Sequence, residues 1–206
     1  MNRVVRTIVA TAGLLALIAP ATGSAHDDRN DDRDRNDNRR LRINLSGFQE
    51  VIPPNLGLGA IFSTGSGRLT LKIDKQNRVI HYELTYEFPD APTPAVGQFV
   101  NQAHLHFGQK HTTGGINVWL CQSADTPAPA AVAAATPRCP SPSGTVSGTI
   151  TPAQVLALAG QGFPAGQDGF DALLEALRND AIYGNVHTDN FPSGEIRGQF
   201  AERDDD

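Results

Sequence analysis

The sequence lacks several features that mark common enzyme classes and membrane proteins. It has no G-x-S-x-G nucleophile elbow, so serine-hydrolase chemistry finds no support. It also has no glycine-rich loop of the kind that cradles a phosphate group. No second apolar run follows the one near the N-terminus, so we expect the mature chain to have no membrane span.

Positive charge is in short supply. The chain has 17 Lys and Arg against 22 Asp and Glu, which gives a net charge of −5. Removal of residues 1–25, which contain Arg3 and Arg6, lowers this value to −7. An acidic chain of this kind is not expected to bind nucleic acid.

Cysteine is scarce, and Cys121 and Cys139 are the only two. They lack the paired C-x-x-C knuckles that zinc sites use. In an oxidising compartment we expect them to form a disulfide that anchors a Pro/Ala-rich loop at 122–142. Loop entropy would make this bond worth about 3 kcal/mol. The alternative is two free thiols.

The N-terminus has the pattern of a secretory signal peptide over residues 1–25. Arg3 and Arg6 precede an apolar stretch at 7–20, and a small-x-small signal ends at Ala25. The alternative is a lone membrane anchor, but the apolar stretch is shorter than the ~20 residues that a spanning helix needs. We therefore predict export, to the cell exterior or the periplasm.

The remaining chain divides into a polar leader, one domain and a short tail. Residues 26–40 contain almost only Asp, Arg and Asn, and this composition predicts a disordered spacer. An electrostatic handle for a surface polymer is the alternative role of that leader. Residues 41–201 form one domain of sufficient size for a hydrophobic core, and residues 202–206 form an acidic tail.

Period-two alternation of apolar and polar residues predicts about eight strands. It runs through 41–47, a hairpin at 67–88, a second hairpin at 101–108 and 115–121, a strand at 143–150, and a closing hairpin at 181–188 and 195–200. There is no β-α-β alternation. The expected fold is therefore all-β: an antiparallel Ig-like or Greek-key β-sandwich or barrel with one or two short helical insertions.

Two segments near the C-terminal third have helical patterns. Thr151, Pro152 and Gln154 match an N-cap, a first helical position and a capping-box partner ahead of "VLALAG" (155–160), and predict a short helix that begins at Pro152. Apolar residues at helical spacing predict a longer amphipathic helix over 169–180.

The candidate chemistry lies in the histidines. His104 and His106 are two apart on a predicted strand, so their side chains point the same way. Neutral imidazole is a common ligand of zinc and copper. A metal site needs a third ligand, and four residues are candidates: His187, His111, Glu50 and Glu195. His187 is the natural choice if its strand pairs near that of His104. The alternative is that the histidines are structural groups that hydrogen-bond carboxylates and carbonyls.

Glu195 and Arg197 also lie two apart on a predicted strand. They could anchor a ligand carboxylate or support His104 and His106 from behind. The alternative is an ion pair on the strand surface, worth at most ~1 kcal/mol.

Three motifs together resemble the chordin-type CHRD domain: "LSGFQEVIPP" (45–54), "AHLHFG" (103–108) and "YGNVHTDNFPSGEIRGQF" (183–200). The last is the most specific, and the resemblance covers about residues 43–200. The matching positions are Glu50, Pro53, Pro54, His104, His106, His187, Glu195 and Arg197. Two departures are the extra Ile52 before the prolines and the lengthened loop between the cysteines.

The resemblance implies an extracellular β-rich module with no agreed catalytic residues. We accordingly predict a secreted binding module rather than an enzyme, with a protein, glycan or surface ligand as partner and no certain cofactor. The alternative is a copper or zinc protein with ligands His104, His106 and His187. A weaker likeness to copper/zinc superoxide dismutase, in the H-x-H strand and the later V-H, makes a redox role one form of that alternative.

Overall fold

The computed structural model describes residues 39–52, 59–90 and 99–201. The predicted signal peptide, leader residues 26–38, Pro53, Pro54 and the tail 202–206 lie outside the described residues. Arg40 already belongs to the first strand, one residue before the predicted start of the domain. Within the described part of the chain, no helix is both long enough and apolar enough to cross a bilayer.

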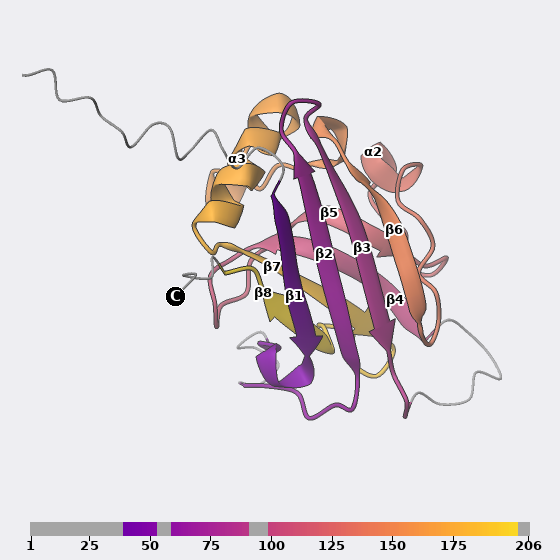
Figure 1. The fold of residues 1–206 in the computed structure, drawn as a ribbon. Helices are drawn as coiled ribbons and strands as arrows, with labels where there is room; N and C mark the ends of the chain where they lie inside the picture. The colour runs from indigo at the N-terminus through magenta and orange to yellow at the C-terminus, as the bar shows by residue number, and fades with distance from the viewer. Residues whose placement is uncertain (1–38, 53–58, 91–98, 202–206) are drawn as a thin grey trace, which may run out of the picture. The chain divides into compact units, whose positions relative to one another are not determined.

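The described residues form one antiparallel sheet of eight strands, in the order β5-β4-β7-β8-β1-β2-β3-β6. The strands are β1 (Arg40–Ser46), β2 (Ser66–Asp74), β3 (Val79–Glu87), β4 (Val100–Phe107), β5 (Gly115–Gln122), β6 (Gly144–Ile150), β7 (Ile182–Thr188) and β8 (Ile196–Gln199). In Figure 1, β1, β2, β3 and β6 form a front layer, and the other four strands cross behind it. The predicted antiparallel sandwich or barrel, with its three hairpins, is confirmed.

The sheet is nearly closed on itself. β1 and β8 join the two layers through one register pair, Ser46 and Arg197. At the opposite edge the Tyr82 hydroxyl of β3 donates a hydrogen bond of 2.7 Å to the carbonyl of Leu120 on β5. The core therefore lies between two curved layers that are tied together at both edges.

The core is built from alternate residues of the strands. Leu69, Leu71 and Leu84 of the front layer have no exposed surface, and neither do Leu105 and Val186 of the back layer. Because side chains alternate along a strand, the neighbours of these residues point to the outer faces of the two layers. The outer face of the back layer carries the histidines.

One long helix of the described residues, α3 (Gly166–Arg178), packs against this core. It buries Phe170, Leu173 and Leu177, as the amphipathic pattern predicted. The helix begins three residues before the predicted range and ends two before its end. Apolar spacing detects only the buried stripe, so it missed the polar first turn that contains Asp168.

The predicted short helix begins at Pro152 as expected, but its predicted continuation through 155–160 was wrong. The capping box at Thr151 and Gln154 is present, but it caps a single 3₁₀ turn, η2 (Pro152–Gln154). The N–H of Val155 closes this turn on the carbonyl of Pro152, and the N–H of Leu156 donates to the carbonyl of Asn117 on β5. This bond to the sheet replaces the bond that would continue the helix, and a second 3₁₀ turn, η3 (Ala159–Gln161), follows.

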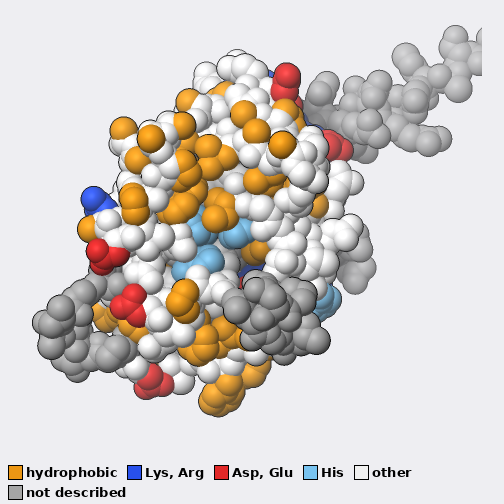
Figure 2. All heavy atoms as spheres, turned by 180° about the vertical axis from the view of Figure 1, so that it is seen from behind, with side chains coloured by type: hydrophobic (Ala, Val, Ile, Leu, Met, Phe, Trp, Pro, Cys, Tyr) orange, Lys and Arg blue, Asp and Glu red, His pale blue; other side chains and the backbone are white. Residues whose placement is uncertain are grey.

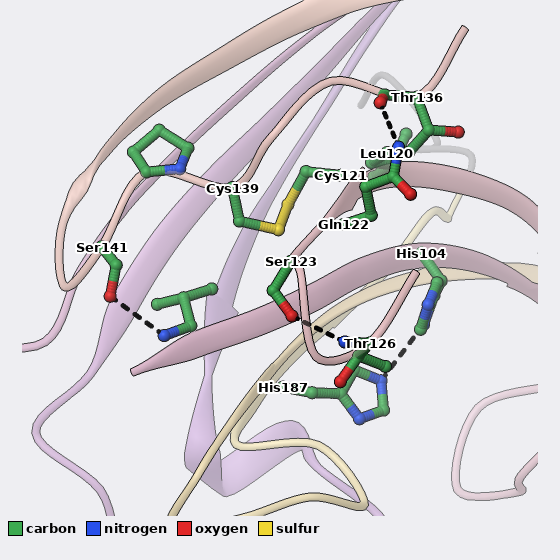
Figure 3. Close-up of a disulfide and its surroundings, with 12 residues drawn as sticks. His104, Leu120, Cys121, Gln122, Ser123, Thr126, Thr136, Cys139, Ser141 and His187 are labelled. Atoms are coloured by element: carbon green, nitrogen blue, oxygen red, sulfur yellow. Dashed lines mark hydrogen bonds between the residues drawn. A yellow bond between two sulfur atoms is a disulfide. The ribbon is translucent and has the colours of Figure 1, made fainter. Parts of the chain in front are cut away.

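The disulfide between Cys121 and Cys139 is present, with 5.0 Å between the two Cα atoms (Figure 3). The loop that it closes has internal order, including one helical turn, α2 (Ala130–Ala133). The buried Gln122 side chain donates to the carbonyls of Ala133 and Thr136 and accepts from the N–H of Ala128. The remaining 3₁₀ turn, η1 (Gly47–Gln49), follows β1.

Candidate functional site

The three predicted histidines meet on the outer face of the back layer. β4 pairs with β7 in an antiparallel register that places His104 beside Asn185 and Gln102 beside His187. The period-two alternation turns His104, His106 and His187 to the same side, away from the core. The strand pairing on which the choice of His187 depended is therefore present.

The three imidazoles are close together and buried. Each offers one ring nitrogen, and these nitrogens all lie within 4.8 Å of one another. His104 Nδ1 lies 3.2 Å from His187 Nε2, and Figure 3 shows these two side chains pointing toward each other. The exposed fractions are 0% for His104, 7% for His106 and 6% for His187. Figure 2, which shows this side of the molecule, has histidine side chains near its centre, bordered by hydrophobic groups.

Two backbone carbonyls fix the orientation of the His106 and His187 rings. His187 Nδ1–H donates to the carbonyl of Pro192 at 2.9 Å, and His106 Nδ1–H donates to the carbonyl of Gly114 at 2.9 Å. Since a carbonyl only accepts, each ring carries its proton on Nδ1 and presents a lone pair on Nε2. His187 Nε2 accepts from His104 Nδ1–H, whereas Nε2 of His104 and Nε2 of His106 have no hydrogen-bond partner among the described residues.

Burial keeps these rings neutral. Desolvation lowers the pKa of His106 to about 4 and that of His187 to about 4. The pKa of His104 is lowered as well, first by desolvation and then by the repulsion of His187 and His106. At neutral pH the cluster is therefore a set of uncharged imidazoles, which is the form that binds metal ions.

Aromatic side chains flank the cluster. The ring of Trp119, on β5, lies 4.3 Å from the ring of His104 in an edge-to-face arrangement. Tyr183, on β7, stacks on His106 with 4.6 Å between ring centroids. Trp119 is the only tryptophan of the chain, so its fluorescence reports on this site alone.

Arg197 supports the site through a loop. Its guanidinium lies 3.4 Å from the Tyr183 ring centroid and donates to the carbonyls of Thr112 and Gln109. That loop leads to Gly114, whose carbonyl holds His106. Arg197 is 2% exposed, so the alternative of a surface ion pair with Glu195 does not describe it.

Glu50 is buried at the edge of this group. Its Oε1 accepts from the N–H of Val51, while its Oε2 has no hydrogen-bond partner among the described residues. Desolvation raises the pKa of Glu50 to about 7, despite the opposing attraction of Arg197. Glu50 lies beside Asn185, and Asn185 Oδ1 lies 3.1 Å from His187 Nε2.

The other two candidate third ligands lie elsewhere. Glu195 is buried, but its carboxylate accepts hydrogen bonds from Ser63 and Thr188. His111 is exposed in the loop between β4 and β5. Neither belongs to the group of metal-capable side chains that the described residues form.

Sequence reasoning missed several members of the site. Asn185 is two residues before His187 and shares its face, so the alternation that identified the histidines could have identified it. Trp119 could have been found in the same way, opposite His104. The carbonyls of Gly114 and Pro192 carry no sequence signal, because any residue can supply a carbonyl.

Comparison with known protein families identifies the family of the chain. The family model of the CHRD domain matches residues 41–200, which is most of the chain. No curated protein and no solved structure matches the chain.

Proposed function

The chain belongs to the CHRD domain family over residues 41–200, and on that premise we propose that it is a secreted module that binds one copper or zinc ion through His104, His106 and His187. One observation carries the proposal. Three buried, neutral imidazoles converge, and the Nε2 lone pair of His106 lacks any hydrogen-bond partner among the described residues. Unsatisfied buried lone pairs are costly unless a ligand completes them.

The distances suit a transition metal. Zn–N bonds of about 2.0–2.1 Å place nitrogens about 3.4 Å apart in a tetrahedral site. The 3.2 Å between His104 Nδ1 and His187 Nε2 is close to this value, and the separations of up to 4.8 Å need only a small ring movement. His104 can carry its proton on Nε2 when Nδ1 binds metal. Three ligands leave a fourth position for water or an external ligand.

The surroundings support the same role. Metal-binding histidines usually donate their second ring N–H to a carbonyl or carboxylate, which orients the ring. His106 and His187 already do so, to Gly114 and Pro192. Copper and zinc are both suited to imidazole, and the donor set contains no thiolate. The disulfide is consistent with the predicted export, because such bonds persist in oxidising compartments.

The test is a metal titration of the exported protein after removal of metal with a chelator. We expect one Cu²⁺ or Zn²⁺ per chain by elemental analysis, with Cu²⁺ quenching the fluorescence of Trp119. His187→Asn and His106→Gln should each lose stoichiometric metal. His111→Gln is the matched control, because it replaces an exposed histidine outside the cluster. Absence of bound metal in the wild type, or equal loss in the His111 variant, would contradict the proposal.

A redox role is a separate question for the copper-loaded protein. The three-imidazole donor set supports metal binding, and an open fourth position allows a small molecule to reach the ion. Superoxide dismutation above that of free Cu²⁺ and of the His187→Asn variant would support it. Activity equal to that of the variant would leave the protein a metal binder without redox function.

A second candidate function is partner binding at a phenylalanine-lined groove. Phe48 and Phe62 are 68% and 87% exposed, with ring centroids 6.1 Å apart. Phe62 borders a depression of about 190 Å³ that is also lined by Phe88, Phe99 and Phe191. Exposed aromatic groups beside such a depression are typical of protein-binding surfaces. The predicted partner is a protein that inserts an apolar side chain.

A peptide array tests this second function. The wild-type protein should bind a set of immobilised apolar peptides. Phe62→Ser should not bind them, because the variant removes the most exposed ring of the groove. His111→Gln should bind the same peptides as the wild type. Identical hits for the wild type and the Phe62 variant would refute the groove as the binding surface.

A further inference from the structure

A divalent ion in the proposed metal site would have no negative charge among its ligands to balance it. A divalent ion bound by three neutral imidazoles would bring two positive charges into a buried region that already contains the Arg197 guanidinium. Burial of unpaired charge is strongly unfavourable. None of the three ligands is a carboxylate, so compensation must come from a neighbouring group.

Glu50 is the buried carboxyl group that is placed to supply it. It is 4% exposed, and its Oε2 lacks a hydrogen-bond partner among the described residues. A Cβ atom at Gly194 would lie 2.5 Å from Glu50 Oε2 and 2.8 Å from Asn185 Nδ2. Both polar atoms therefore pack closely against residue 194. Only a glycine, which has no Cβ and adopts a φ of +120° without strain, allows this approach.

Asn185 connects Glu50 to the histidines. Its amide nitrogen faces Glu50, and its Oδ1 lies 3.1 Å from His187 Nε2. No hydrogen bond between Glu50 and a histidine is found in the described part of the chain, and Asn185 borders both of them. The other charged or titratable groups that face it are Arg197 on β8 and Tyr183 on β7.

We propose that Glu50 is the charge-compensating residue of the metal site: its carboxyl group is protonated in the metal-free protein and releases that proton when a divalent cation binds. The inference rests on the proposed metal-binding function. The O–H bond of the carboxyl group breaks, the proton goes to solvent, and no bond to the metal forms. Binding then adds two positive charges and removes one, which leaves a net gain of one.

Burial lowers the pKa of all three histidines, so they are not the expected source of this proton, and the Glu50 variant tests this. Burial holds the pKa of His106 and of His187 at about 4, so both rings are already neutral at pH 6. The pKa of Glu50 is about 7, so this carboxyl group still carries its proton at pH 6. A proton released at pH 6 is therefore assigned to Glu50 or to metal-bound water, and substitution separates these two sources.

The experiment measures proton release when ZnCl₂ is added to the metal-free, full-length exported protein at pH 6. Isothermal titration in two buffers of different ionisation enthalpy gives the number of protons. We expect about one for the wild type and for Glu87→Gln, an exposed carboxyl control. Glu50→Gln keeps the shape and hydrogen-bonding capacity of the side chain, and should release none. Its affinity for Zn²⁺ at pH 8 should be weaker by tenfold or more, since the attraction between opposite charges is lost.

The outcomes separate this inference from the proposed function. If the wild type binds no zinc, the metal site itself is refuted. If the wild type and Glu50→Gln both bind zinc with the same proton release and affinity, the metal site stands and the role of Glu50 is overturned. Circular dichroism and the Trp119 emission spectrum establish that the variant is folded.

Discussion

The surroundings of Glu50 change the pKa of its carboxyl group. Its carboxyl group accepts a hydrogen bond from the N–H of Val51, lies beside the Asn185 amide and is 4% exposed. Desolvation outweighs the attraction of Arg197, so the protonated form is favoured up to a pKa of about 7. This property exists without any metal and can be tested alone.

The stability of the metal-free protein should depend on pH through Glu50. Its pKa rises from 4.5 when unfolded to about 7 when folded, so its contribution is full below 4.5 and is lost as the pH rises to 7. Glu50→Gln cannot ionise. Urea unfolding should show the variant gaining about 2–3 kcal/mol relative to the wild type between pH 5 and pH 8. A constant difference across this range would mean that Glu50 is ionised in the folded protein.

Single elements differ in how far the sequence predicted them. The strands were predictable because one face of each packs on the core, which imposes period-two alternation. The helix α3 was predictable for the same reason, with a period of 3.6. The segment 155–160 was not, because Leu156 donates to Asn117 on a distant strand. Local propensity contains no information about that contact.

In the site too, some residues were predictable from local patterns and others were not. His104 and His106 were identified from their spacing, and His187 from a pairing of strands that the sequence only suggested. The contacts of Arg197 were not predictable, since they are made to the carbonyls of Gln109 and Thr112 in a loop. Sequence patterns therefore identified the clustered histidines better than the groups that hold them in place.

The loop closed by the disulfide offers a test at the scale of elements. Gln122 makes three hydrogen bonds to the backbone of that loop and is 7% exposed. Gln122→Ala would leave buried backbone groups unsatisfied and should lower the free energy of unfolding by about 3 kcal/mol. Gln76→Ala, in the exposed turn between β2 and β3, is the control. A loss below about 1 kcal/mol would show that the disulfide alone orders the loop.

For the whole molecule, export and the disulfide together predict a defined mature form. Intact mass and N-terminal sequencing of the exported protein should show a chain that starts at His26 and lacks two hydrogens relative to the dithiol. The control is the same protein after reduction, which should regain them. Retention of residues 1–25 would indicate a membrane anchor instead of a cleaved signal.

Alternate residues of β4 and β7 lie on opposite faces of the sheet and belong to different parts of the structure. Leu105 and Val186 fill the core, while His104, His106 and His187 occupy the opposite face of the same strands. The two faces of β4 and β7 share one set of backbone hydrogen bonds, but their side chains point to opposite sides. Substitutions on the outer face could therefore remove or alter the site during evolution without disturbing the core. The histidine site and the hydrophobic core can therefore change independently of each other, although they share the same two strands.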